Sequence, residues 1–374
     1  MINLPTIWEK WNPDICDRDI YRNFNKEIKL DKCDIVKRIG SDSADAEVYH
    51  IKYKNINFAL KLMPRIDSDS EEKNRLEIET AIKAGSELPK YFPKVFGSGT
   101  SDKYVNKSNS LLFKKAEEYS CYMSLLEQLK SKRQKLEFSQ AFREGTTLKE
   151  LIKKFNLESC EKTAVVDYLI SELANGDLGN FIKKPRKIYD WNIILFDIIT
   201  GIYYMATKLK KAHSDLHPGN ILIIVATDNC NVSPVKDDQG LLATVRNEQL
   251  QVTALLHDFG RAINVTKKNS ETYFTGLLSF CKEFLGASKR PDLIVPKQIK
   301  KAIIEINEVI IKLTTDQSIE LTGKKIYNIY KYVLEIVNNV DDSEKPKRGR
   351  SRSRRSKSKS RNRSRKSKKR AHSK

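Results

Sequence analysis

Two short motifs hold the residue types that could do chemistry in this chain. The first runs from His213 to Ile223 and contains Asp215, followed five residues later by Asn220. The second lies thirty-eight residues beyond Asn220 and reads Asp258-Phe-Gly. An acid can accept the proton of an attacking hydroxyl, while an amide and a second acid can hold magnesium on nucleotide phosphates. The two motifs therefore predict a phosphoryl-transfer site, with Asp215 as proton acceptor and Asn220 and Asp258 as metal ligands.

Apolar elements stand next to both motifs and would position them. Residues 191–205 have an almost continuous apolar face, which predicts a buried helix that delivers His213 to its loop. A short β-type apolar run follows Asn220, and a second apolar strand precedes Asp258. The spacing between Asp215 and Asn220 lets one loop present both side chains to one phosphate.

The two motifs, in this order and in this setting, resemble the protein-kinase-like superfamily over most of residues 31–285. The resemblance implies an α+β, two-lobed fold with a small antiparallel-sheet N-lobe and a mainly helical C-lobe. It also implies ATP and Mg²⁺ as cofactors and a nucleotide bound between the lobes.

A lysine inside an apolar strand fits the same resemblance. Lys61 stands in Asn57-Phe-Ala-Leu-Lys61-Leu-Met, which is similar to the strand that carries the phosphate-binding lysine. A lysine in such a strand is costly to bury without a partner. The family's partner is a glutamate on the next helix, and Glu77 matches the family pattern best. Glu72 and Glu79 remain alternatives.

Two further segments resemble nucleotide-binding parts of the family. Gly40 and Val48 lie where the phosphate-covering loop would be, but this loop has one glycine where the family pattern has three. Because glycine lets the backbone approach phosphate closely, we expect modest affinity for ATP. Residues 164–182 are similar to the hinge, whose backbone around Glu172 to Ala174 would bind the adenine edge.

Three features depart from the family pattern. Ser214 replaces the arginine that pairs with a phosphate on the activation loop, which argues against control by phosphorylation there. His217 stands where serine/threonine kinases usually have lysine, and it can still donate to phosphate. No Ala-Pro-Glu triplet follows Gly260. Among kinases, the chain resembles most the divergent serine/threonine kinases of large DNA viruses of the iridovirus type.

The same resemblance suggests a domain organisation. We expect strands within residues 33–63, 92–99 and 164–172 and one helix near 70–84. Helical periodicity at 110–119, 122–130 and 147–155 marks an insertion. The expected parts are an N-terminal extension (1–30), an N-lobe (31–172) with a helical insertion (101–163), a C-lobe (173–342) with a hairpin insertion (225–252), and a disordered tail (343–374).

Composition limits the class of protein. The 374 residues are enough for a sizeable core, and no run of eighteen apolar residues predicts a membrane span. The six cysteines are far apart, which suggests neither a zinc site nor a dense disulfide framework and favours buried free thiols. We therefore expect an intracellular protein, in the nucleus or cytoplasm of a eukaryotic host or in a virion, and not a secreted one.

The C-terminal tail carries most of the formal net charge of +21. Residues 345–374 contain seventeen Lys or Arg and no Asp or Glu, with eight serines between them. Such a segment cannot form a packed core and is typical of arms that bind nucleic acid or another polyanion, or of a nuclear address.

Three functions fit these observations. The first is a serine/threonine protein kinase, with protein substrates and a tail that binds nucleic acid. The second is a small-molecule or atypical kinase, which His217 and the missing Ala-Pro-Glu favour. The third is a catalytically weak, kinase-like scaffold that binds nucleic acid, which the glycine-poor loop favours.

Overall fold

The computed structural model describes residues 20–21, 24–39, 45–104, 110–160, 163–183, 188–225, 252–266, 270–315 and 322–340. The chain divides into two units, Met1–Val340 and Asp341–Lys374, and every described residue belongs to the first. Gly40, nearly all of the expected hairpin insertion and the expected tail lie outside the described residues. The described part is an α+β structure with a small antiparallel sheet and several helices, compatible with two lobes.

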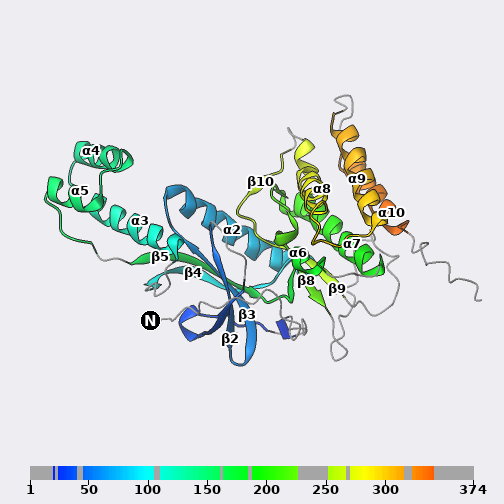
Figure 1. Cartoon of the computed structure of the whole chain (residues 1–374), viewed down its shortest axis with the longest axis horizontal. Coiled ribbons are helices and arrows are strands. Elements are labelled where there is room, and N and C mark those ends of the chain that lie inside the picture. Colours follow the sequence, from blue (N-terminus) through cyan, green and yellow to red (C-terminus); the bar gives the residue numbers. More distant parts are fainter. Residues whose placement is uncertain are drawn as a thin grey trace, which may run out of the picture. The chain divides into compact units, whose positions relative to one another are not determined.

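Five antiparallel strands form the larger sheet, in the order β1-β2-β3-β5-β4 (Figure 1). They are β1 (Asp34–Arg38), β2 (Glu47–Tyr53), β3 (Ile56–Pro64), β4 (Val95–Tyr104) and β5 (Ala164–Glu172). The strands fall in the segments expected from the sequence, although β4 extends past residue 99. A short 3-10 helix, Leu30–Lys32, precedes β1.

The side chains of β3 alternate between the two faces of the larger sheet. Phe58, Leu60 and Leu62 are fully buried in the core of the sheet. Ala59 and Lys61 therefore point to the opposite face, because successive side chains of a strand alternate. Lys54 and Asn55 make the β2–β3 turn with φ of 49° and 66°, as the tightest hairpin turns require.

The described end of the expected N-terminal extension belongs to this core. Tyr21 and Phe24 contact Phe58 and Phe96 through ring pairs whose centroids are 5.5–5.8 Å apart. The backbone N–H of Ile28 donates to the carbonyl of Phe96. These residues cover the face of the sheet opposite Lys61.

Helix α2 (Ser68–Glu87) packs next to the sheet and corresponds to the helix expected near 70–84 (Figure 1). It begins with a capping box, in which the Asp67 side chain accepts a hydrogen bond from the backbone of Ser70 at 2.6 Å. Asn74, Glu77 and Ala81 lie on its buried face.

The helical insertion differs in detail from the expectation. It consists of α3 (Leu111–Gln128), α4 (Lys132–Arg143) and α5 (Leu148–Phe155). Figure 1 shows α3 leading away from the sheet to α4 and α5. The two expected helices at 110–119 and 122–130 form one continuous helix, and α4 was not expected. Leu125, Phe138 and Leu151 are fully buried between the three helices.

A disulfide closes this insertion and corrects the expectation of free thiols. Cys121 of α3 is bonded to Cys160, with Cα atoms 5.4 Å apart. The two residues are thirty-nine positions apart in the sequence, so their spacing gave no signal. Of the other cysteines in the described ranges, Cys33 and Cys281 are free thiols.

The second part of the structure is mainly helical and contains two small sheets. One has the order β6-β8-β9 and the other pairs β10 with β7. The strands are β6 (Gly176–Asp177), β7 (Lys211–His213), β8 (Ile221–Val225), β9 (Val252–Leu256) and β10 (Ala262–Asn264). The helices are α6 (Leu178–Phe181), α7 (Ile188–Tyr204), a π turn (Met205–Leu209), two 3-10 turns (Pro218–Asn220 and Ser270–Tyr273), α8 (Thr275–Ala287), α9 (Lys297–Thr315) and α10 (Gly323–Asn338).

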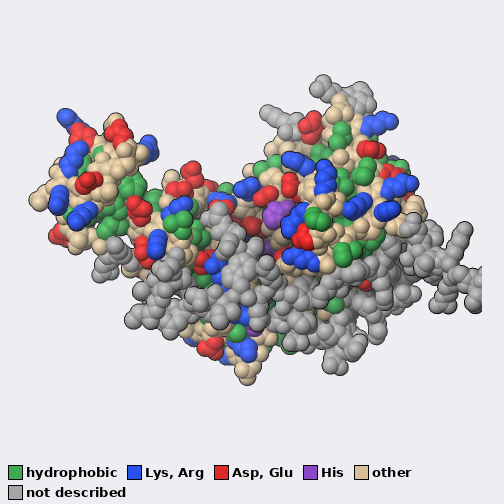
Figure 2. Space-filling view, in the orientation of Figure 1, with side chains coloured by type: hydrophobic (Ala, Val, Ile, Leu, Met, Phe, Trp, Pro, Cys, Tyr) green, Lys and Arg blue, Asp and Glu red, His purple; other side chains and the backbone are tan. Residues whose placement is uncertain are grey.

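Helix α7 is the centre of this part, as its apolar sequence predicted. Trp191, Ile194 and Ile198 are fully buried, and α10 and β9 pack against the helix. On the face shown in Figure 2, Lys and Arg side chains are mixed with acidic ones over α8–α10 and do not form one basic patch. Among the helices described, none has the length and apolarity needed to cross a bilayer.

Candidate functional site

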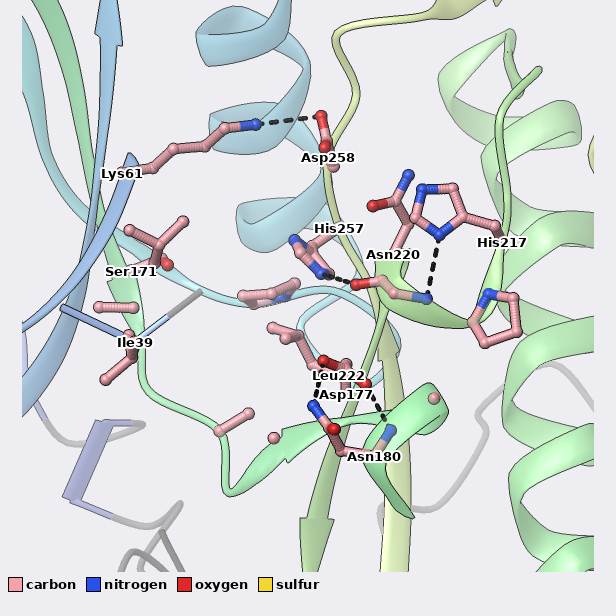
Figure 3. A pocket seen from close by; sticks show the side chains of 18 of the residues that line it. Ile39, Lys61, Ser171, Asp177, Asn180, His217, Asn220, Leu222, His257 and Asp258 are labelled. Atoms are coloured by element: carbon pink, nitrogen blue, oxygen red, sulfur yellow. Dashed lines mark hydrogen bonds and ion pairs between the residues drawn. The ribbon is translucent and has the colours of Figure 1, made fainter. Parts of the chain in front are cut away.

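A cavity of about 810 Å³ lies between the sheet and the mainly helical part. Its volume is in the range of sites for small molecules and cofactors. Figure 3 shows its walls: Lys61 enters from the sheet, and Asp258, Asn220 and His217 enter from the opposite side. Residues predicted separately from the sequence thus meet in one cavity.

Lys61 contacts two acids at once. Its Nζ lies 2.5 Å from Glu77 Oε1 and 3.0 Å from Asp258 Oδ1. Burial alone would lower the pKa of Lys61, but the two carboxylates raise it above its ordinary value. Burial would likewise raise the pKa of Asp258, but Lys61 holds it well below the ordinary range. The site therefore contains a fixed cation and an ionised carboxylate.

Helical geometry selects Glu77 from the three candidate partners of Lys61. Glu77 lies on the buried face of α2, with a side chain 5% exposed. Glu72 and Glu79 lie on the exposed face and both pair with Arg75 at 2.6 Å. Residues two and five positions from Glu77 along a helix cannot share its face.

A buried network around Asp167 of β5 holds α2 in place. The Asp167 carboxylate accepts hydrogen bonds from Arg65, at 2.8 and 2.9 Å, from Thr100 at 2.7 Å and from the side-chain amide of Asn74 at 3.1 Å. The Asn74 amide also donates to the carbonyl of Met63 at 3.0 Å. Because Asn74 lies one helical turn before Glu77, this network fixes the position of Glu77 relative to β3.

Asp258 has an unusual backbone conformation. Its φ is +65°, a left-handed value that few non-glycine residues adopt and that costs about 1–3 kcal/mol. Phe259 is buried next to Phe92 and the ring of His213, with ring centroids 5.8 and 5.9 Å away. Packing on one side of Asp258 and the ion pair on the other thus hold the strained residue. A Cβ on Gly260 would meet Glu77 Oε2 at 3.0 Å, so a side chain there would crowd the ion pair.

The loop between β7 and β8 presents Asp215 and Asn220. The Asn220 amide Nδ2 donates to the carbonyl of Asp215 at 2.9 Å, which ties the two ends of the loop together. Helix α8 supports the loop through Ser279, whose Oγ accepts from the backbone N–H of Leu216 at 2.9 Å. The Asp215 side chain is 34% exposed, so an acceptor hydroxyl can reach it.

The donor atoms of Asn220 and Asp258 fit a magnesium ion. Asn220 donates through Nδ2, which leaves its carbonyl Oδ1 as the ligand atom, and Figure 3 shows the amide facing the side from which Asp258 approaches. Amide and carboxylate oxygens are the hard ligands that magnesium prefers. The described residues contain no cluster of three or more His, Cys, Asp or Glu for a metal. Phosphate oxygens and water would have to complete the coordination.

His217 has a defined tautomer. Its Nδ1 accepts a hydrogen bond from the backbone N–H of Gly219 at 3.0 Å (Figure 3). A ring nitrogen that accepts carries no proton, so the proton of the neutral ring sits on Nε2. His217 can therefore offer one N–H donor to a ligand in the cavity.

The neighbouring histidines are structural. His257 Nε2 lies 3.2 Å from the carbonyl of Gly219, and His213 Nε2 lies 2.9 Å from the carbonyl of His257. Burial lowers the pKa of His257 to about 4 and also lowers that of His213, so both rings are neutral near pH 7. They link the loop that carries Asn220 to the segment that carries Asp258.

The predicted hinge lines the same cavity. Glu172 and Ala174 both border it, as does Val48 of β2. The backbone N–H of Glu172 donates to the backbone carbonyl of Lys94. The backbone N–H and carbonyl of Ala174, in contrast, make no hydrogen bond within the described residues. The backbone of Ala174 is therefore available to the edge of a flat polar ring.

Several lining residues were missed by the sequence reasoning. Ala59 of β3 and Leu222 of β8 border the cavity from its two sides, and Asp177 and Asn180 border it at the start of α6 (Figure 3). Strand alternation could have found the first two, since Ala59 precedes Lys61 by two positions and Leu222 follows Asn220 by two. Asp177 is the N-cap of α6 and accepts from the backbone N–H of Asn180 at 2.7 Å.

Arg261 is a further residue that the sequence did not indicate. Its Nη1 lies 3.5 Å from Asp215 Oδ2, and the hydroxyl of Ser214 donates to its carbonyl. Asp215 thus stands beside a guanidinium that comes from the segment after Gly260.

No model of a known protein family matches this chain, and no curated protein matches it.

Proposed function

We propose that this protein is an ATP-dependent phosphotransferase of the protein-kinase-like type, and that serine and threonine hydroxyls of proteins are its acceptors. The observation that carries the proposal is Lys61, paired with both Glu77 and Asp258 inside a cavity that Asn220 also borders. A cation, two metal-binding oxygens and a reachable carboxylate are the groups that transfer of a phosphoryl group requires.

The cavity suits the nucleotide in this proposal. Val48 and Ala59 on one side and Leu222 on the other make an apolar slot for adenine. Ala174 offers its backbone N–H and carbonyl to the edge of the base. Lys61 lies farther inside and holds the phosphates, while Glu77 fixes Lys61.

Asn220 and Asp258 would hold magnesium on those phosphates. When bound, the ion neutralises part of the charge that develops on the phosphoryl oxygens during transfer. Asp258 would hold the ion through Oδ2, since its Oδ1 contacts Lys61.

Asp215 acts on the acceptor. Its carboxylate orients the hydroxyl and takes its proton while the hydroxyl oxygen forms a bond to the γ-phosphorus. The bond between that phosphorus and the bridging oxygen breaks, and ADP leaves. His217 donates Nε2–H to a phosphoryl oxygen.

The exposure of Asp215 supports a protein acceptor, because a hydroxyl on a large chain can reach a carboxylate that is one third exposed. A second candidate is a small-molecule phosphotransferase. It is favoured by the extension of the cavity past His217 to Glu283 and Arg290, which leaves room for a small acceptor beside the nucleotide. The basic tail favours the first candidate.

Transfer of labelled phosphate from ATP tests the proposal. Purified full-length chain is incubated with no added protein, with an acidic casein-like protein and with a basic histone-like protein. We expect label on the chain or on one of the added proteins, and none with Asp215→Asn. Absence of label in every reaction, with nucleotide bound normally, would favour the scaffold function expected as an alternative.

A further inference from the structure

The backbone fixes Arg261 next to Asp215. Strand β10 pairs antiparallel with β7, and Ala262 lies opposite His213 in the register. The hydroxyl of Ser214 donates to the carbonyl of Arg261. These bonds bring the residue after Gly260 to the residue before Asp215. The contact between Arg261 and Asp215 is thus a consequence of strand pairing and not of a chance surface approach.

The Arg261 guanidinium itself is exposed and weakly held. Its side chain is 65% exposed, and its contact with Asp215 is a single ion pair at 3.5 Å. Exposed pairs of this kind contribute little to folding stability. The fold therefore does not need the guanidinium where it stands, and the charge is available to a ligand.

The acceptor side of the site needs a cation. The transferred phosphoryl group carries negative charge through the reaction. Lys61 is shared between Glu77 and Asp258, and one ring nitrogen of His217, Nδ1, is already bound to the backbone N–H of Gly219. Among the described residues, Arg261 is the one cation in ion-pair contact with Asp215.

We propose that Arg261 is a catalytic residue, which leaves Asp215 when substrates bind and holds the oxygens of the transferred phosphoryl group. This inference rests on the proposed phosphotransferase function. The planar N–H groups of arginine match two phosphoryl oxygens at once, and lysine cannot reproduce this geometry. Arg261 exchanges no atom in the step: the acceptor's proton goes to Asp215, and the leaving group is ADP.

This role also accounts for Ser214. A serine at that position binds the backbone of Arg261 through its hydroxyl. The loop with Asp215 thereby gains a positive charge from the neighbouring segment, although it carries no arginine of its own between His213 and Asn220.

Steady-state kinetics of the full-length chain test this inference, with labelled ATP and whichever protein accepts label. Arg261→Gln is compared with wild type and with Arg133→Gln, a matched control on α4 that is 89% exposed and pairs with Glu137. We expect Arg261→Gln to lower kcat about 10²-fold, as loss of one charge-stabilising donor does, with little change in KM for ATP. Arg261→Lys should recover only part of kcat, and Arg133→Gln should behave as wild type.

Chemical rescue separates catalysis from structure. Added guanidinium ion, below denaturing concentrations, should raise kcat of Arg261→Ala and leave wild type unchanged. Equal kcat for wild type and Arg261→Gln would overturn this inference alone, as would a change confined to KM for the acceptor. A wild-type chain that transfers no phosphate would overturn the proposed function, and this inference with it.

Discussion

Asp215 combines two properties that suit an acid–base group. Its backbone carbonyl is anchored by Asn220, while its carboxylate is partly exposed. The hydrogen bond from Asn220 fixes the backbone of Asp215, and the exposed side chain can be reached by an acceptor hydroxyl.

Replacement of Asp215 by Asn should lower turnover about 10²–10⁴-fold, because a positioned acid–base group contributes that much. Nucleotide affinity should change little, since the carboxylate does not border the cavity in which Lys61 and Asp258 lie. Labelled-phosphate transfer and calorimetric titration with ATP measure the two effects. Glu137→Gln, which removes an exposed carboxylate paired with Arg133 on α4, is the control. Unchanged turnover in Asp215→Asn would place the proton acceptor elsewhere.

The buried histidines make stability depend on pH. Burial lowers the pKa of His213, and it also lowers that of His50, whose Nε2 is 2.8 Å from Asn57 Oδ1. In the unfolded chain both rings have a pKa of about 6.5. The unfolded state therefore binds protons first as pH falls, so the free energy of unfolding must decrease below about pH 6.5.

We expect the melting temperature to fall steadily between pH 7 and pH 5. His213→Gln keeps a donor for the carbonyl of His257 but does not titrate, so its melting temperature should depend less on pH. Thermal melts across this range measure both slopes. Identical slopes for the two proteins would show that His213 does not contribute to the pH dependence.

At the scale of elements, α2 is held to the sheet by more than the Lys61–Glu77 pair. Asp167 of β5 binds Arg65, Thr100 and Asn74, and these bonds connect β4, β5, α2 and the residue that follows β3. This arrangement therefore fixes α2 on the sheet independently of the Lys61–Glu77 pair.

Asp167→Asn should destabilise the protein by about 3 kcal/mol, because it removes one partner of a largely buried ion pair. It should also lower kcat, since α2 is freed to carry Glu77 away from Lys61. Glu71→Gln is the matched control: Glu71 binds the same Arg65 at 2.5 Å but is 50% exposed. Its effect should be below about 1 kcal/mol. Denaturant unfolding and kcat are measured for both, and equal effects would contradict this role for Asp167.

At the scale of the whole molecule, the chain combines a folded part, whose charges are mixed on the face shown in Figure 2, with a strongly basic C-terminal segment. We propose that residues 345–374 bind nucleic acid without sequence preference. Seventeen cations can displace counterions from phosphates, so affinity should fall steeply with salt.

Deletion of residues 345–374 should abolish most of this affinity and leave phosphotransfer intact, because the proposed catalytic residues all precede residue 262. Phosphorylation of the eight serines should act like deletion, since each phosphate adds roughly −1.5 to −2 charge. Salt titrations of DNA and RNA binding are compared for the full-length, deleted and phosphorylated proteins. Equal salt slopes for the three would show that the tail does not bind nucleic acid.

The sequence alone determined the features that depend on the pattern of neighbouring residues. The apolar strand around Lys61, the apolar face of residues 191–205 and the spacing of Asp215, Asn220 and Asp258 are all visible in the sequence itself. The resemblance that these motifs carry implied an α+β fold with a small antiparallel sheet. Of the residues it selected, the structure brings Lys61, Asn220 and Asp258 to one cavity, whereas Asp215 does not line it.

Tertiary structure decided the contacts between distant segments. The pairing of Cys121 with Cys160, the Asp167 network and the contact of Arg261 with Asp215 each join residues tens of positions apart. Local periodicity shows which face of an element is buried, but it does not show which other element covers that face. For this reason the sequence could propose the members of the site, whereas only the fold could show which side chains touch.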